Sequence, residues 1–254
     1  MASFPAILQS EWTKIRSVRS TIWTLALTFV ITLGIGALLS LLTRNNFEEF
    51  RSDDSPFDAT GTAFSGIILG ELAIIVFGVL AVGNEYSTGM IRVTLAAVPQ
   101  RGTLLTGKAV VLGGLALAVS LVTAFLTFFV GQALLGDHST DLGEPNVLRA
   151  VFGAALYLTM LCLFSAGVTA MLHNQTLALG VLVPFFFLLS PILSAVPKVK
   201  TLAHYFPDYA GSRMMLVYEQ NGQPYGPWTG FLICLAWTVA ALAGGALVLK
   251  RRDA

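Results

Sequence analysis

Long apolar stretches separated by short polar ones dominate the chain. Six of them have the roughly 20 residues that a helix needs to cross a hydrocarbon core of about 30 Å. They cover residues 21–42, 63–82, 107–135, 147–172, 176–196 and 228–248. The pattern predicts an all-α integral membrane protein in which six transmembrane helices form a single transmembrane domain over residues 1–254. No polar block is long enough for a separate catalytic domain, so we expect a protein that is not an enzyme.

The residues before the first span, 1–20, predict a helix that lies along the inner surface of the membrane. Apolar side chains recur every three or four positions and charged ones lie mostly on the other side. The apolar set is Phe4, Leu8, Trp12, Ile15 and Val18, and the charged set is Glu11, Lys14, Arg16 and Arg19. We expect the basic residues to face anionic lipid. Because no small-residue cleavage site follows, we interpret the first span as a retained helix and not as a signal peptide.

The composition agrees with a membrane protein. The 254 residues are 55% hydrophobic and 11% charged, with a mean hydropathy of +0.75, and soluble domains carry about twice that charged fraction. A net charge of +1 gives no basic surface for nucleic acid. Cys162 and Cys234 lie inside apolar runs, and the three histidines are isolated from one another, so we expect no metal site.

The distribution of basic residues predicts the orientation. With both termini in the cytoplasm, nine Lys and Arg residues lie inside and six outside, and basic residues accumulate on the cytoplasmic side. The chain is therefore expected in the bacterial plasma membrane, with a cytoplasmic tail at residues 249–254 and an outer segment at 197–227. Pro184 and Pro191 are expected to kink the fifth span, and the outer segment to cap an outer opening.

Two features inside the spans are candidate packing or transport sites. Small residues recur every four positions in the first span, a spacing that lets a helix from this chain or from a second copy approach closely. They are Thr24, Thr28, Thr32, Gly36 and Ser40. Glu71 is the only ionisable residue well inside a span. It is a candidate contact for a cationic substrate or a proton relay, and the alternative is a protonated carboxyl hydrogen-bonded to a neighbouring helix.

The connection between the second and third spans, residues 83–106, is longer than a hairpin of helices needs. It runs into "GTLLTGKA", where Gly102, Gly107 and Lys108 have the spacing of a phosphate loop. Ala109, however, stands where a Ser or Thr should bind magnesium, and no predicted strand precedes the motif. We therefore expect no cofactor in this chain, with ATP and magnesium bound elsewhere.

The segments "SEWTKIRSVRSTIWTL" and "NEYSTGMIRVTLAAVPQRGTLLTGKAVV" resemble the permease subunits of ABC-2 type ABC transporters. The resemblance implies the ABC-2 permease fold and one transmembrane half of an exporter, which acts with a second permease copy or a paralogue. It also implies two separate ATPase subunits that hold ATP and magnesium. In that family the connection between spans two and three forms the coupling helix that docks on the ATPase. Here that role falls on Glu85, Tyr86, Ser87, Thr88, Gly89, Met90, Ile91 and Arg92, with residues 94–99 closing the segment.

The residue chemistry of this segment fits a docking role on its own. Glu85 and Arg92 are suited to charge-assisted contacts with a partner, while Tyr86, Met90 and Ile91 are suited to fill a groove. Gly89 weakens the helix and Pro99 is a natural stop. The alternative is that the same residues only cap two hairpin helices at the lipid surface.

These observations predict an ATP-driven efflux permease for a hydrophobic or amphiphilic cargo such as a drug, lipid or peptide. Two other classes remain open. One is a secondary transporter in which protons act through Glu71. The other is a membrane assembly or sensory subunit that keeps the scaffold and moves no cargo. The first would lose transport when the proton gradient collapses, and the second would show no transport at all.

Overall fold

A computed structural model describes residues 3–50, 56–97, 100–218 and 224–251, and every regular element in these ranges is helical. Six helices in them are long and apolar enough to cross a membrane: Arg19–Asn45, Ala59–Ser87, Arg101–His138, Val147–Leu172, Gln175–Ala195 and Pro227–Arg251. The predicted number of spans and the all-α class are confirmed. Most of these helices are longer than the predicted apolar spans, because the helical backbone hydrogen bonds continue into the polar residues at their ends.

Short breaks divide this architecture into smaller elements. The first half comprises α1 (Phe4–Ser17), α2 (Arg19–Asn45), α3 (Phe47–Phe50), α4 (Ala59–Ala63), η1 (Phe64–Gly66), α5 (Ile67–Ser87), α6 (Met90–Ala97) and α7 (Arg101–Leu135). The second half comprises η2 (Gly136–His138), α8 (Val147–Leu172), α9 (Gln175–Pro184), η3 (Phe185–Leu189), α10 (Ser190–Ala195), α11 (Lys200–Ala203), α12 (Pro207–Ser212), η4 (Arg213–Met215) and α13 (Pro227–Arg251). The second, third and fifth spans are therefore composite helices.

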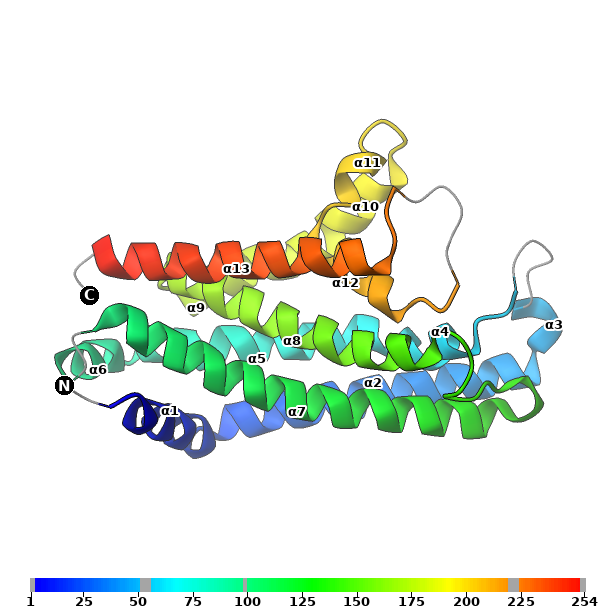
Figure 1. The fold of residues 1–254 in the computed structure, drawn as a ribbon, viewed down its shortest axis with the longest axis horizontal. Helices are drawn as coiled ribbons and strands as arrows, with labels where there is room; N and C mark the ends of the chain where they lie inside the picture. The colour runs from blue at the N-terminus through cyan, green and yellow to red at the C-terminus, as the bar shows by residue number, and fades with distance from the viewer. Residues whose placement is uncertain (1–2, 51–55, 98–99, 219–223, 252–254) are drawn as a thin grey trace.

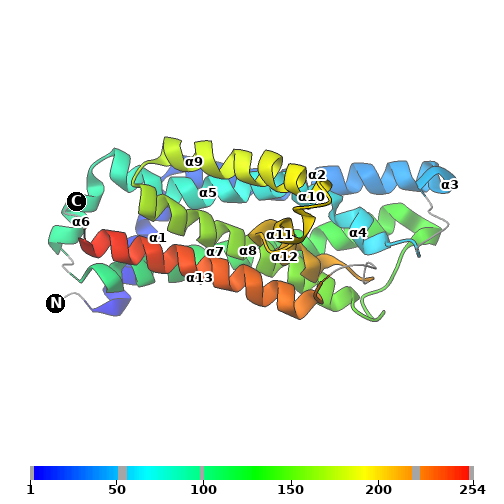
Figure 2. The same ribbon diagram turned by 90° about the horizontal axis from the view of Figure 1, so that it is seen from above.

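The core lies around α8. In the most apolar window of α8, 72% of the residues are buried, and in the α4–α5 span 67%, whereas the other four spans reach only 22–28%. α8 packs against α5, α7 and α13, and α9 and α13 flank it in Figure 2. The remaining helices present most of their apolar side chains outward, as expected for helices in contact with lipid.

The small-residue row of the first span faces inward. Thr24, Thr28, Thr32, Gly36 and Ser40 are all buried, and α2 packs on α4, α5 and α7 of the same chain. The approach is close at Gly36, where an added Cβ would lie 2.3 Å from the carbonyl oxygen of Ala63. The row therefore serves packing within this chain and is not an exposed face for a second copy.

The fifth span changes direction before the outer segment. Pro184 ends α9, a five-residue π-helix (η3) follows, and α10 and α11 project away from the bundle (Figure 1). The missing N–H of proline and the wider π turn are both common causes of such bends. The outer segment then turns back, and α12 packs against α8 and α13.

One end of the bundle gathers elements from both halves of the chain. α1, α6 and the last turn of α13 lie at this end, and α3 lies at the opposite end (Figures 1 and 2). The guanidinium of Arg101, at the start of α7, donates a hydrogen bond of 2.6 Å to the carbonyl oxygen of Leu249 in α13. This end also contains the segment predicted to bind an ATPase.

Candidate functional site

The predicted coupling segment forms a sharp turn between two helices. Glu85, Tyr86 and Ser87 end α5, Thr88 and Gly89 make the turn, and Met90, Ile91 and Arg92 begin α6. Gly89 has a φ of +70°, a backbone conformation that glycine adopts without strain. The turn allows α6 to leave the direction of α5. Pro99, the predicted stop, lies outside the described residues.

The inner side of α6 packs on its neighbours. Ile91 is buried in a small apolar cluster with Ile7 of α1 and Leu104 of α7. Tyr86 packs beside this cluster, and its ring centroid lies 4.6 Å from that of His173 after α8. α6 is therefore an integral helix of this end of the bundle and not a loose loop.

The opposite side of α6 is open. Met90 is 38% and Val93 71% exposed, and Arg92, Ala96 and Ala97 are also exposed. We call these five residues the outer face of α6. Arginine is one of the residue types enriched at protein contact surfaces, and the exposed Val93 places an apolar group beside Arg92.

Beneath α6 lies a buried cluster of four charged residues, here called the ion cluster. Lys14 Nζ lies 2.6 Å from Glu11 Oε1 and 2.9 Å from Glu85 Oε1. Lys108 Nζ lies 2.9 Å from the same Glu85 oxygen and also pairs with Glu11 Oε2. Glu11, Glu85 and Lys108 are 1%, 4% and 5% exposed. Two positive and two negative charges cancel, which makes their burial tolerable.

The ion cluster connects four helices. Glu11 and Lys14 belong to α1, Glu85 to α5 and Lys108 to α7, and Lys14 also donates a hydrogen bond of 3.3 Å to Thr94 of α6. Burial lowers the pKa of Lys14, but its pairing with Glu11 and Glu85 outweighs burial and raises that pKa above its ordinary value. Pairing therefore favours the charged form of Lys14, and the cluster attaches α6 to α1, α5 and α7.

Sequence reasoning missed this cluster. It placed Glu11 on the polar side of α1, considered Lys108 as part of a rejected phosphate-loop motif and assigned Glu85 to the surface that contacts a partner. The structure places the Glu85 carboxylate against the two lysines of its own chain. One signal was present in the sequence: Glu11 lies four residues from both Ile7 and Ile15, on the face of α1 that is buried.

A cavity of about 480 Å³ lies between α5, α8, η3 and α12, away from the end of the bundle that holds α1 and α6 (Figure 1). Its walls are mostly apolar and include Phe64, Phe186 and Phe187. Glu71 lines it and accepts a hydrogen bond of 2.6 Å from the hydroxyl of Tyr157. The size suits a small-molecule site, whereas the hydrogen bond also agrees with a structural role for Glu71.

A second carboxyl lines the same cavity. Asp208 of α12 accepts a hydrogen bond from the hydroxyl of Ser190 in α10, and burial raises its pKa. The outer segment thus covers the cavity and adds a polar group to it. Among the described residues no group of three or more His, Cys, Asp or Glu side chains could hold a metal ion.

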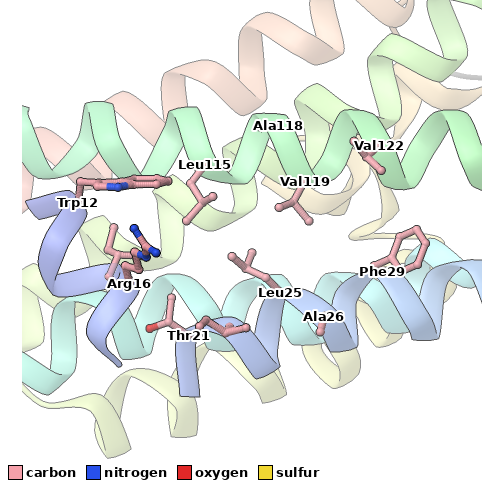
Figure 3. Close-up of a pocket in the computed structure, with 12 residues that line it drawn as sticks. Trp12, Arg16, Thr21, Leu25, Ala26, Phe29, Leu115, Ala118, Val119 and Val122 are labelled. Carbon is pink, nitrogen blue, oxygen red and sulfur yellow. The ribbon is translucent and has the colours of Figure 1, made fainter. Parts of the chain in front are cut away.

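An open groove of about 590 Å³ runs along the lipid side between α1, α2 and α7. Leu25 and Phe29 of α2 face Val119 of α7 across it, and Trp12 and Arg16 lie at the end formed by α1 (Figure 3). The groove exists because the chain bends at Val18, which has an extended conformation between α1 and α2.

The chain matches a model of a known protein family. The family is described as ABC-2 family transporter protein, and the match covers residues 7–198. This range contains α1 from residue 7 onward, the ion cluster, α6 and the groove, and it ends before α12 and α13. No curated protein matches the chain.

Proposed function

The chain belongs to the ABC-2 family of transporter proteins, and from this premise we propose that it is a permease subunit of an ATP-driven exporter whose ATPase docks on α6. Family membership and six membrane-spanning helices make it a membrane transport subunit. The ATPase, its binding surface and the cargo belong to the proposal. The observation that carries it is the exposed outer face of α6 directly above the buried ion cluster.

This arrangement suits the transfer of motion. A partner that pulls on Met90, Arg92 and Val93 moves α6 as a unit, because Ile91 and the ion cluster attach it to α1, α5 and α7. Breaking such a buried network costs several kcal/mol. Motion of the ATPase would therefore shift whole transmembrane helices before it would detach α6.

The complex we propose contains two ATPase subunits, which bind ATP and magnesium, and two permeases, either two copies of this chain or this chain and a paralogue. α6 and both termini then face the cytoplasm of a bacterial cell, in agreement with the excess of basic residues at that end. ATP binding and hydrolysis would shift the population between inward-open and outward-open states.

The cargo path in this proposal includes the outer cavity. Aromatic walls with two carboxyls, Glu71 and Asp208, match an amphiphilic molecule better than a simple ion. Drugs, lipids and peptides with an apolar body are the cargo classes that fit. The bend at Pro184 and the segment around α12 would then open and close the outer side.

The test is co-expression with a candidate ABC ATPase and purification through a tag on the permease. Arg92→Asp reverses a charge on the outer face of α6, and Arg251→Asp makes the same change at another exposed position at the same end. We expect Arg92→Asp, and Val93→Asp, to lose most of the copurified ATPase and its stimulation. Arg251→Asp should retain both. Equal binding by all three variants would show that α6 is not the docking surface.

The position of Glu71 in a cavity supports a second candidate, a secondary transporter driven by protons. In that case collapse of the proton gradient should abolish transport while ATP depletion should not, and Glu71→Gln should be inactive. A membrane assembly subunit would show no transport in either assay. Efflux that needs ATP and survives loss of the gradient would rule out both.

A further inference from the structure

We propose that the groove between α1, α2 and α7 is a binding site for one anionic phospholipid, taken from the leaflet in which α1 lies. The proposal goes beyond the transport function and does not depend on an ATPase. It follows from three properties of the groove: its length, the chemistry of its walls and the free charge at its rim.

The length of the groove fits one leaflet. Its wall on α2 runs over residues 21–29 and its wall on α7 over residues 115–122. At a rise of 1.5 Å per residue these walls are about 12 Å and about 10 Å long. Half of a hydrocarbon core is about 15 Å. A helix of a second copy would cross both leaflets, whereas a single lipid chain ends near the middle, as this groove does at Phe29 and Val122 (Figure 3).

The walls are suited to an acyl chain. Leu25, Phe29, Leu115, Val119 and Val122 supply the apolar surface, and no acidic residue lines the groove. In Figure 3 these side chains border the open space on both sides. An acyl chain held there would make dispersion contacts with α2 and α7 together.

Arg16 supplies the charge at the rim. Its side chain is exposed, lines the groove, and makes no ion pair or hydrogen bond with any residue that the structure describes. The nearest acid in its own helix, Glu11, is already neutralised by Lys14 and Lys108. Guanidinium groups bind phosphate well, and Trp12, 48% exposed beside Arg16, has the character of a residue at headgroup depth. An anionic headgroup therefore complements this end of the groove.

A lipid in this site would also stabilise the ion cluster. Ile15 lines the groove and, with its other side, a small cavity beside Glu11, Lys14, Glu85 and Lys108. A bound lipid would press α1 against α2 and α7 within one turn of these charges. We infer that the lipid helps to keep α1, and through it the base of α6, in place.

The test uses the full-length chain in detergent, supplied with dioleoyl phosphatidylglycerol or dioleoyl phosphatidylcholine, with bound lipids counted by native mass spectrometry. We expect one phosphatidylglycerol per chain to remain under conditions that remove phosphatidylcholine. Arg16→Gln should reduce its retention roughly fivefold, the usual effect of one basic residue at a membrane surface. Arg16→Lys should retain most of it. Arg251→Gln, at an exposed arginine of α13 outside the groove, is the matched control and should bind as the wild type does.

A bulky side chain tests the groove itself. Ala118→Phe fills the wall on α7, and Val110→Phe adds an aromatic ring to an exposed position of the same helix outside the groove. Only Ala118→Phe should lower retention, while both variants should elute as the wild type in size exclusion. Equal retention of the two lipids, an equal loss with Arg251→Gln, or disulfide cross-linking between two Ala26→Cys chains in membranes would overturn the proposal.

Discussion

Lys108 Nζ lies 2.9 Å from Glu85 Oε1, and both side chains are almost completely buried. This contact joins the start of the third span to the end of the second, directly beneath the helix that connects them. Glu11 and Lys14 complete the cluster from α1. The connection between the second and third spans is therefore attached to the bundle by largely buried charged groups, and ion pairs are stronger there than at a surface.

Glu85→Gln should destabilise the protein by about 3 kcal/mol, because it leaves the buried Lys108 and the partly buried Lys14 with a single carboxylate. The measurement is the free energy of unfolding in detergent, followed by circular dichroism during titration with SDS. Arg92→Gln, at an exposed position one turn into α6, should change stability by less than about 0.5 kcal/mol.

A double variant separates charge balance from packing. Glu85→Gln with Lys108→Gln leaves one positive and one negative charge, Lys14 and Glu11, which still pair. We expect the double variant to be more stable than the sum of the two single changes predicts, by about 1 kcal/mol or more. Simple additivity would show that the ion cluster does not act as a unit.

The raised pKa of Lys14 gives stability a defined dependence on pH. A lysine whose pKa is higher in the folded state stabilises that state fully below its unfolded pKa of about 10.4, and the effect is lost as the pH rises through the folded pKa. The stability advantage of the wild type over Lys14→Met should therefore be constant at neutral pH and shrink above about pH 10.4. Unfolding midpoints of both proteins between neutral and alkaline pH would check this. A constant difference would contradict it.

The fold could be predicted in outline because hydropathy averages many side chains over each span. The changes of helix type inside the second and fifth spans could not be predicted. A 3₁₀ turn forms at Phe64–Gly66 and a π turn at Phe185–Leu189. The type of turn depends on which backbone carbonyl accepts the hydrogen bond from each N–H. That choice is made by packing against other helices and leaves little trace in composition.

The sequence indicated the segment that forms α6 as the candidate site, but it did not predict the ion cluster beneath that helix. The length of the connection and the family resemblance both indicated α6. The burial of Glu85, however, depends on Lys14 and Lys108, which lie 71 and 23 positions away in the sequence. Contacts over such separations follow from the tertiary fold. Tyr157, the partner of Glu71 at a separation of 86, was missed for the same reason.

Tyr157→Phe should destabilise the protein by about 1–3 kcal/mol, because it removes the hydrogen bond to Glu71 and leaves that buried carboxyl oxygen without its donor. Tyr205→Phe, at a partly exposed position in the outer segment, is the matched control and should have little effect. Glu71→Gln keeps an oxygen that accepts the same bond, so its stability should stay within about 1 kcal/mol of the wild type. SDS titration measures all three, and a neutral Tyr157→Phe would argue against a structural role for this pair.

Two glycines of α2 provide the sharpest test of the inward-facing row. An alanine Cβ at Gly36 would lie 2.3 Å from the backbone oxygen of Ala63, so α2 and α4 would have to separate. We expect Gly36→Ala to cost about 1–3 kcal/mol. At Gly34, half a turn away, an added Cβ meets nothing within 4 Å, and the better helix propensity of alanine should stabilise the protein by up to about 1 kcal/mol. Both variants are measured in one unfolding assay. Changes of opposite sign in the free energy of unfolding would establish which side of α2 packs against the bundle. Equal changes would show that the row does not pack inside this chain.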